Sequence, residues 1–241
     1  MSGSVDRLVV VTGAAGRIGS VVLDRLSSRW QIRATDLKPA GGIEALDVTD
    51  FERCAATFRG ADAVVHLAAN PSPDAEWSAL SGPNVDGAYA VAAAARECGV
   101  RRLVLASSVQ AMTAYPETLQ LRAEDAPRPA NLYGATKAWA EALGSWVAAS
   151  SPTSVVALRI GYFSGQPPAG DRATPRNLSA WLSHGDCARL IQAAVESEHD
   201  GFVVVNGISA NRFRIAELGA AERQIGYEPV DDTWSQLEPN R

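Results

Sequence analysis

Tyr133 and Lys137 are the two residues whose types and spacing are best suited to catalysis. The segment 131–150 is predicted to be a helix, and residues four positions apart on a helix lie on one face, one turn from each other. A phenol, with a pKa of about 10, is a poor base at neutral pH, but a nearby ammonium group favours its ionised form. The spacing therefore predicts a tyrosine base assisted by a lysine. The alternative is a surface helix on which the two side chains only pack together.

Ser108 is the expected third member of this group. The apolar run 102–107 predicts a strand that ends at Ser107-Ser108. A hydroxyl at the tip of that strand can hydrogen-bond the same substrate oxygen as the phenol of Tyr133. We therefore predict Ser108, Tyr133 and Lys137 as the catalytic residues.

A glycine-rich turn near the N-terminus predicts a phosphate site. Residues 8–11 are a short, continuous apolar run, typical of a strand buried on both faces of a parallel sheet. Gly13, Gly16 and Gly19 follow, and a helix is expected at about 17–26. The first glycine suits a tight turn, the second the approach of a phosphate to the backbone, and the third close packing of helix on sheet. The amides at the start of that helix would face a pyrophosphate.

Asp36 stands where a dinucleotide cofactor would be selected. It ends the strand expected at 31–36, and a carboxylate there accepts hydrogen bonds from ribose hydroxyls and repels a 2′-phosphate. The alternative is an ordinary turn residue after a strand; after this glycine turn Asp36 predicts NAD rather than NADP. The predicted cofactor-binding residues are Gly13, Ala15, Gly16, Arg17, Ile18, Asp36, Leu37, Lys38, Asp47, Val48, Leu67, Ala68, Ala69, Ala106, Tyr133, Lys137 and Ile160.

Strands and helices alternate along the chain. Strands are expected at 8–11, 31–36, 44–48, 63–69, 102–107 and 201–206, helices at 17–26, 50–58, 84–98, 131–150, 178–182, 188–195 and 215–225, and a loop at 70–83. Short links between them indicate right-handed crossovers and an α/β fold, a Rossmann-type doubly wound parallel sheet. We predict an NAD-binding domain over 1–160 and a small substrate-binding lobe over 161–241, too short to fold alone.

Composition argues against nucleic acid and membranes as partners. The formal net charge is −5, and phosphate backbones require a basic face. There is no signal peptide and no apolar run of about eighteen residues, so a cytoplasmic location is expected. Cys54, Cys98 and Cys187 have neither metal nor disulfide spacing, and we expect no metal. The alanine-rich helix 84–98, together with Trp139 and Trp146, predicts a homodimer; alternatively both tryptophans belong to the monomer core.

The chain resembles the extended short-chain dehydrogenase/reductase superfamily over nearly its whole length. The resemblance rests on the glycine turn, Ser108 and Tyr133-Gly134-Ala135-Thr136-Lys137. Further segments are similar to those of uronate dehydrogenases and haloarchaeal NAD-dependent glucose-6-phosphate dehydrogenases: Val64-Val65-His66-Leu67-Ala68, Arg128-Pro129 with Leu132-Tyr133-Gly134, Arg159-Ile160-Gly161, and Trp181-Leu182-Ser183-His184. The resemblance implies oxidation of C1 of a cyclic sugar or sugar acid, with Arg176 holding a substrate anion. The substrate-binding residues it implies are Asn70, Ser108, Gln110, Tyr162 and Arg176.

Three positions, in two segments, differ from those dehydrogenases. Val109-Gln110 stands where they have Asn-His, and Tyr162 where they have a small polar residue. Both differences fall in the expected substrate pocket. The leading hypothesis is an NAD-dependent sugar dehydrogenase. The alternatives are an epimerase, dehydratase or ketoreductase of the same superfamily and a non-catalytic NAD-binding sensor, and Arg176 could instead be a solvated loop residue. His66 is expected to pack within a strand, and His184 to cap or pack.

Overall fold

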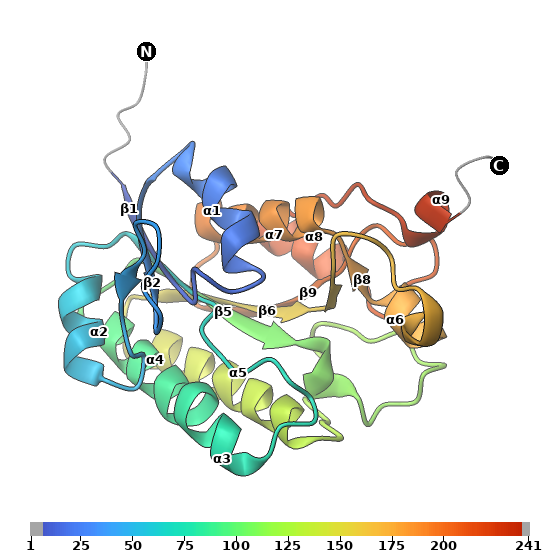
Figure 1. The fold of residues 1–241 in the computed structure, drawn as a ribbon, viewed down its shortest axis with the longest axis horizontal. Coiled ribbons are helices and arrows are strands. Elements are labelled where there is room, and N and C mark those ends of the chain that lie inside the picture. Colours follow the sequence, from blue (N-terminus) through green and yellow to red (C-terminus); the bar gives the residue numbers. More distant parts are fainter. Residues whose placement is uncertain (1–6, 238–241) are drawn as a thin grey trace.

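The computed structural model describes residues 7–237, and its centre is one parallel sheet of seven strands (Figure 1). The strand order is β3-β2-β1-β4-β5-β6-β9, and every neighbouring pair is parallel. The bounds are β1 Leu8–Thr12, β2 Gln31–Asp36, β3 Glu44–Ala45, β4 Ala63–His66, β5 Arg102–Ser108, β6 Ser154–Ile160 and β9 Phe202–Gly207. The order reverses at β1, and the predicted Rossmann-type fold is confirmed.

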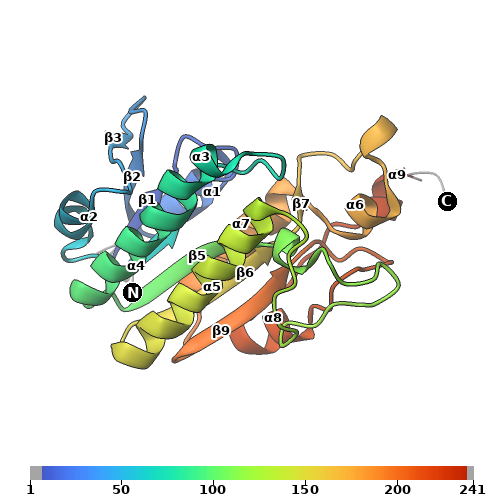
Figure 2. The ribbon, with the colours of Figure 1, turned by 90° about the horizontal axis from the view of Figure 1, so that it is seen from below.

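Helices cover both faces of the sheet (Figures 1 and 2). On one face lie α1 (Gly19–Ser27), α7 (His184–Glu196) and α8 (Gly219–Ile225), and on the other α2 (Phe51–Phe58), α4 (Gly87–Glu97) and α5 (Leu132–Ser150). Successive strand residues serve the two layers alternately: Val9 and Val11 belong to the first core, Val10 to the second. This double burial explains the continuous apolar runs of the strands.

Local signals account for where several helices begin. Asp50 accepts a hydrogen bond from the Arg53 amide and caps α2, and Asn131 accepts one from the Gly134 amide and caps α5. The expected loop 70–83 is only partly a loop, because α3 (Trp77–Leu80) and a π-helical segment, Ser81–Asp86, lead into α4. The expected strand 44–48 is reduced to two residues.

The segment after residue 160 has two parts. One part, α7, β9 and α8, completes the sheet and one of its helical layers. The other contains β7 (Tyr162–Phe163), a 3₁₀ turn at Gly170–Arg172, α6 (Pro175–Ser179) and β8 (Trp181–Leu182), and the described chain closes with α9 (Thr233–Leu237). The helix expected at 178–182 is wrong: the helix ends at Ser179 and a short strand follows. The division at residue 160 stays a prediction.

Two further expectations concern single side chains. His66 is buried and its Nδ1 lies 2.8 Å from the Thr12 hydroxyl, so it packs within its strand as expected. Trp139 and Trp146 do not belong to the core, since they are 40% and 38% exposed on α5. Within residues 7–237, none of the helices is long and apolar enough to cross a membrane.

Candidate active site

A cavity of about 590 Å³ lies at the carboxyl ends of the strands. In Figure 1 the arrowheads of β5 and β6 point towards the side of the molecule where the segment carrying α6 lies. Parallel strands bring their carboxyl ends to one edge, which is where open α/β sheets bind ligands. The predicted site residues that line it are Gly13, Gly16, Arg17, Ile18, Leu67, Ala69, Ala106, Ser108, Gln110, Tyr133, Lys137, Ile160, Tyr162 and Arg176.

The three predicted catalytic residues meet in this cavity. Tyr133 and Lys137 lie one turn apart on α5, and the Lys137 ammonium is 5.6 Å from the centre of the Tyr133 ring. That ammonium donates a hydrogen bond of 2.8 Å to the Ala106 carbonyl on β5. The hydroxyl of Ser108, two residues further along the same strand, accepts from the Gln110 amide and interacts with the Tyr133 hydroxyl. This arrangement can deliver a base, a cation and a hydrogen-bond partner to one substrate oxygen.

Burial dominates the ionisation of this group. It raises the pKa of Tyr133 above its usual value, and the hydrogen bond with Ser108 opposes that rise. Burial also lowers the pKa of Lys137 to about 8. The pKa of the phenol is therefore not lowered in the protein alone, because desolvation of the hydroxyl disfavours its ionised form. His66 is held neutral beside them, with a pKa lowered to about 3 by burial and by the charge of Lys137.

A second layer of polar contacts fixes the tyrosine end of α5. Thr136 donates to the Tyr133 carbonyl at 2.8 Å and accepts from the side-chain amide of Asn84 at 3.1 Å. Asn84 is buried in the π-helical segment, and its amide nitrogen also donates to the Asn70 carbonyl. On the other side Gly134 packs so closely on the Gln110 carbonyl that a β-carbon there would overlap it. The backbone after Ser108 therefore packs directly against the turn of α5 that carries Tyr133.

The glycine turn has the geometry that a pyrophosphate needs. Gly13 has a φ of +71°, and a β-carbon there would lie 2.5 Å from the Ala68 nitrogen, so only glycine fits between β1 and β4. Asp36 accepts hydrogen bonds from the Ala15 amide at 3.1 Å and the Lys38 amide at 3.2 Å. Each carboxylate oxygen keeps acceptor capacity for a ribose hydroxyl. These residues fit NAD.

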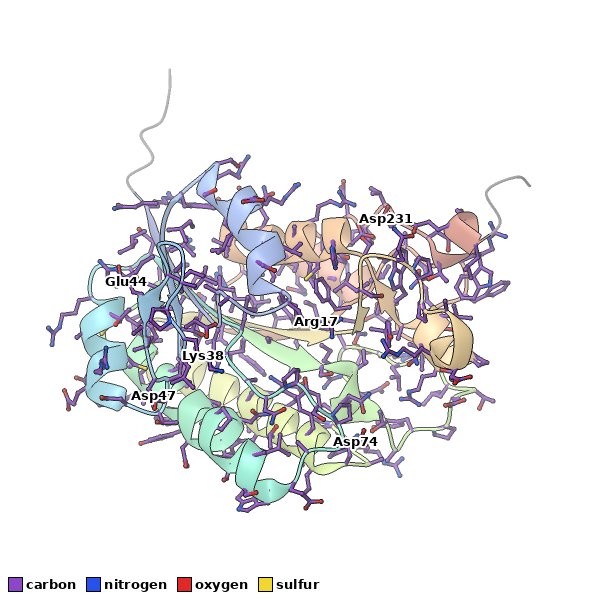
Figure 3. The ribbon with its side chains drawn as sticks, viewed as in Figure 1. Arg17, Lys38, Glu44, Asp47, Asp74 and Asp231 are labelled. Atoms are coloured by element: carbon purple, nitrogen blue, oxygen red, sulfur yellow. The ribbon has the colours of Figure 1, made fainter. Side chains whose placement is uncertain are left out.

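The remaining predicted cofactor-binding residues do not line the cavity. Leu37 is 65% exposed beside Asp36, and Val48 is buried against Gly87. Asp47 accepts from the amide and hydroxyl of Thr49, which hold the pKa of its carboxyl below the usual value. Lys38 and Asp47 both lie on the β2–β3 side of the molecule in Figure 3. Ala15 and Ala68 also lie outside the lining.

The predicted substrate residues are only partly brought together. Gln110, Tyr162 and Arg176 line the cavity, and Gln110 accepts a hydrogen bond of 2.9 Å from the Asn131 side chain. Arg176 also lies 3.6 Å from Glu117, an ion pair in which the glutamate is 65% exposed. Asn70 does not line the cavity, because its polar atoms bond to Ser72, Ala79 and Asn84.

Several lining residues were not identified from the sequence. Phe163, Arg172 and Asn177 come from the segment around α6, and Pro71 and Pro73 from the loop after β4. One usable signal was present: Thr174-Pro175 is a cap followed by proline at the first helical position, which marks the start of α6. The positions of the others depend on tertiary contacts and carry no local signature.

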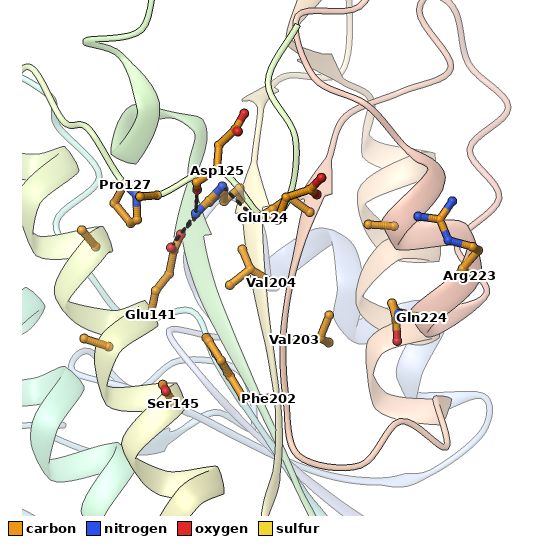
Figure 4. A pocket seen from close by; sticks show the side chains of 16 residues that line it. Glu124, Asp125, Pro127, Glu141, Ser145, Phe202, Val203, Val204, Arg223 and Gln224 are labelled. Carbon is orange, nitrogen blue, oxygen red and sulfur yellow. Dashed lines mark hydrogen bonds and ion pairs between the residues drawn. The ribbon is translucent and has the colours of Figure 1, made fainter.

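A second hollow, of about 570 Å³, lies beside the edge strand β9 (Figure 4). The buried pair Arg159–Glu141 lies against it, with Nε and Oε1 2.9 Å apart, and Ser107 donates to the same carboxylate. None of the predicted site residues lines this hollow. Arg159 and Glu141 neutralise each other, and we assign no ligand to this hollow.

The fold and the cavity define a nucleotide-binding α/β protein with a serine, tyrosine and lysine site. The chain matches the model of the NAD dependent epimerase/dehydratase family over residues 9–199, and it belongs to that family. It is 36% identical to an L-arabinose 1-dehydrogenase (NAD(P)(+)) of Haloferax volcanii, over 95% of this chain and 99% of the relative. It is 31% identical to an NAD-dependent glucose-6-phosphate dehydrogenase of the same organism, over 95% of each chain.

The structural comparison agrees with this assignment. A mutant uronate dehydrogenase from Agrobacterium tumefaciens, solved in complex with NAD, superposes with a TM-score of 0.86 at 30% identity. The superposition covers 97% of this chain and 88% of the other. The resemblance inferred from the sequence motifs is therefore confirmed, and the arabinose enzyme is a relative that those motifs did not point to.

Proposed function

We propose that this protein is an NAD-dependent dehydrogenase that oxidises C1 of a sugar or sugar acid, with Tyr133 as general base. The observation that carries the proposal is the convergence of Ser108, Tyr133 and Lys137 with the glycine turn in one cavity. The relatives named as sugar and uronate dehydrogenases support it. Bound NAD supplies the hydride acceptor.

Each residue of the site has a separate role in the proposed reaction. Tyr133 takes the proton of the C1 hydroxyl, and Ser108 holds that oxygen by a hydrogen bond. Lys137, held in place by the Ala106 carbonyl, lowers the cost of forming the phenolate in a buried site. Asn84 and Thr136 fix the orientation of the helix that carries the base. Ser108, Tyr133 and Lys137 are themselves buried, which limits the access of water to the reacting atoms.

The charge of the cavity favours an anionic substrate. Its lining contains Arg17, Lys137, Arg172 and Arg176 and no carboxylate. The pyrophosphate of NAD offsets two positive charges, which leaves Arg172 and Arg176 for a carboxylate or phosphate on the sugar. A guanidinium grips either group in bidentate fashion and sets its distance from C1. Val109 and Tyr162 replace polar contacts in the same pocket and favour a substrate with fewer hydroxyls there.

The test is to follow NADH formation with uronic acids, aldose phosphates and neutral aldoses, L-arabinose included. An anionic substrate should show the highest kcat/KM, and Arg176→Ala should raise its KM by roughly tenfold or more while a neutral sugar is affected little. Glu117→Gln should have the opposite effect: it removes the ion-pair partner of Arg176 and should lower the KM for the anionic substrate. If a neutral aldose is preferred, the anion assignment is wrong although the dehydrogenase proposal stands.

NAD is proposed to be preferred over NADP. The carboxylate of Asp36 lies beside the glycine turn, where it would face a 2′-phosphate. Asp36→Ala should relax the preference, and equal or tighter binding of NADP by the wild type in calorimetry would contradict it.

A ketoreductase, epimerase or dehydratase remains the alternative reaction, because the same three residues serve proton transfer in either direction. It gains support if no sugar yields NADH but NADH reduces a ketone. We also propose a homodimer, from the exposed aromatic residues Tyr89 on α4 and Trp139 and Trp146 on α5. The cytoplasmic location stays a prediction.

A further inference from the structure

Arg17 makes a contact that joins the two sides of the cavity. It belongs to the glycine turn, at the inner end of α1 (Figure 3). Its Nη2 nevertheless donates a hydrogen bond of 2.7 Å to the main-chain carbonyl of Phe163. Its guanidinium carbon also lies 5.8 Å from the centre of the Phe163 ring. Among the hydrogen bonds of residues 7–237, this is the only one between the turn 13–18 and β7.

Phe163 is where the substrate side of the cavity is attached. The ring is almost fully buried and stacks on His184 at the start of α7, with centroids 4.8 Å apart. Tyr162, the residue before it, lines the cavity. The chain after it runs through 164–180, which supplies Arg172 and Arg176, before β8 pairs with β7 over two residues. So short a ladder fixes this segment weakly by itself.

We propose that Arg17 is a bridge that couples cofactor binding to the substrate side of the cavity. Its guanidinium holds the pyrophosphate and the Phe163 carbonyl at the same time, so that the bound cofactor orders segment 162–182 and positions Tyr162, Arg172 and Arg176. The inference depends on NAD binding and not on which sugar is oxidised.

The chemistry of the side chain supports two simultaneous contacts. A guanidinium has five N–H donors in a planar fork, and the Phe163 carbonyl uses one of them. Arg17 lines the cavity next to Gly16 and Ile18, where the backbone amides of the turn would meet a phosphate. A lysine would keep the charge but lose the fork, so Arg17→Lys separates bridging from charge alone.

The experiment compares ADP-ribose, which contains the pyrophosphate, with AMP, which does not. Hydrogen–deuterium exchange is measured on the protein saturated with each ligand. In the wild type ADP-ribose should slow exchange of 162–182, and AMP should protect only the residues around Asp36. In Arg17→Lys, saturating ADP-ribose should still protect the glycine turn but no longer 162–182. Calorimetry should show ADP-ribose binding weakened about tenfold and AMP binding changed less than about twofold.

Two further variants make the result specific. Phe163→Leu keeps the main-chain carbonyl and removes the ring, and it should retain most of the protection of 162–182. Arg29→Lys is the matched control: this arginine also lies near an aromatic ring, 5.7 Å from Trp30, and pairs with Glu196 on α7, but outside the cavity. It should behave as the wild type.

Three results would overturn the bridge. In the wild type, ADP-ribose gives no protection of 162–182, or AMP gives as much. In Arg17→Lys, ADP-ribose protects 162–182 as well as in the wild type, so that the positive charge alone would explain the effect of residue 17. Because the assay uses no sugar, failure of the bridge is distinguishable from failure of the proposed dehydrogenase activity. If the variant is unstable in a thermal melt, the comparison of the two ligands in the wild type alone decides.

Discussion

Burial acts on Tyr133 and Lys137 in the same sense, because it disfavours the charged form of each. The phenol is held neutral in the protein by itself and the lysine pKa falls to about 8. A base of this kind becomes effective when another positive charge is added beside it. In the proposed reaction the positively charged nicotinamide of bound NAD would supply such a charge, so that the base would be strengthened when the hydride acceptor is present. This links proton abstraction to cofactor occupancy.

Tyr133→Phe should remove the base and leave the cofactor site intact. The ring and its contact with the Lys137 ammonium remain, while the proton acceptor is lost. General-base catalysis contributes typically about 10² or more, so kcat should fall at least a hundredfold. NADH binding, followed by fluorescence, should change less than about twofold. Retention of more than about a tenth of the wild-type kcat would assign the base to another group.

Lys137→Met should stabilise the cofactor-free protein while abolishing activity. The folded pKa of about 8 lies below the usual 10.5, so at neutral pH the folded state carries a buried charge that the unfolded chain carries in water. Burying this charge lowers the free energy of unfolding of the wild type by about 3 kcal/mol. The variant avoids that cost but loses the hydrogen bond to the Ala106 carbonyl, which lowers its own free energy of unfolding by about 1 kcal/mol. Denaturation in urea at pH 7 measures the gain.

The pH dependence of that gain has a definite sign. Between pH 8 and 10.5 the unfolded chain keeps the lysine proton and the folded protein releases it, so wild-type stability from this group rises with pH across that window. The advantage of Lys137→Met should therefore shrink as pH rises from 8 to 10.5. A gain that is independent of pH would mean that apolar packing, and not the buried charge, is responsible.

At the scale of elements, α5 and the segment after β5 are held at a fixed separation by Gly134. A β-carbon there would overlap the Gln110 carbonyl, so Gly134→Ala should push Tyr133 away from Ser108. A displacement of about 1 Å can cost up to a hundredfold in rate, and we expect kcat to fall by roughly that factor. Steady-state kinetics of the purified variant check this.

Gly144→Ala is the matched control on the same helix. Its β-carbon would meet only side chains, Phe202 at 2.8 Å and Leu105 and Val155 at 3.1 Å. It should lower the free energy of unfolding by about 1–3 kcal/mol and leave kcat within a few-fold of the wild type. Equal losses of kcat in both variants would show that general loosening of α5 is enough, and the specific spacing at Gly134 would not matter.

Most elements with a clear local pattern were predicted, and so was the part of the site that they carry, although the apolar strand β6 was not among the expected strands. Tyr133 and Lys137 meet Ser108 because helical spacing and the parallel strand ends leave little choice. The segment 164–180 has no apolar periodicity, and its position depends on long-range contacts such as Arg17 with Phe163 and Arg176 with Glu117. Arg172 and Asn177 were therefore missed, whereas Arg176 was inferred from the family resemblance.

At the scale of the whole molecule, one helical face carries several exposed apolar side chains. Trp77, Tyr89, Leu132, Trp139 and Trp146, which we call the aromatic patch, are 38% to 56% exposed. They come from α3, α4 and α5, which pack together on one side of the sheet (Figure 2). Tyr89 and Trp146 stack with centroids 6.2 Å apart. Exposed aromatic groups gathered on one face are typical of an interface, and the small residues of α4 allow a second helix pair to approach closely.

The proposed homodimer predicts a change of mass when the aromatic patch is disrupted. The wild type should sediment at twice the chain mass of 25.4 kDa, and Tyr89→Glu combined with Trp146→Glu should sediment as the single chain, because two carboxylates would be desolvated at the contact. Phe213→Glu is the control, since Phe213 is 61% exposed but packs against Trp234, away from the patch, and should leave the dimer intact. Sedimentation of the wild type as a single 25.4 kDa species at micromolar concentration would refute the dimer. NADH binding should survive in the double variant, because the aromatic patch contributes no residue to the lining of the cavity.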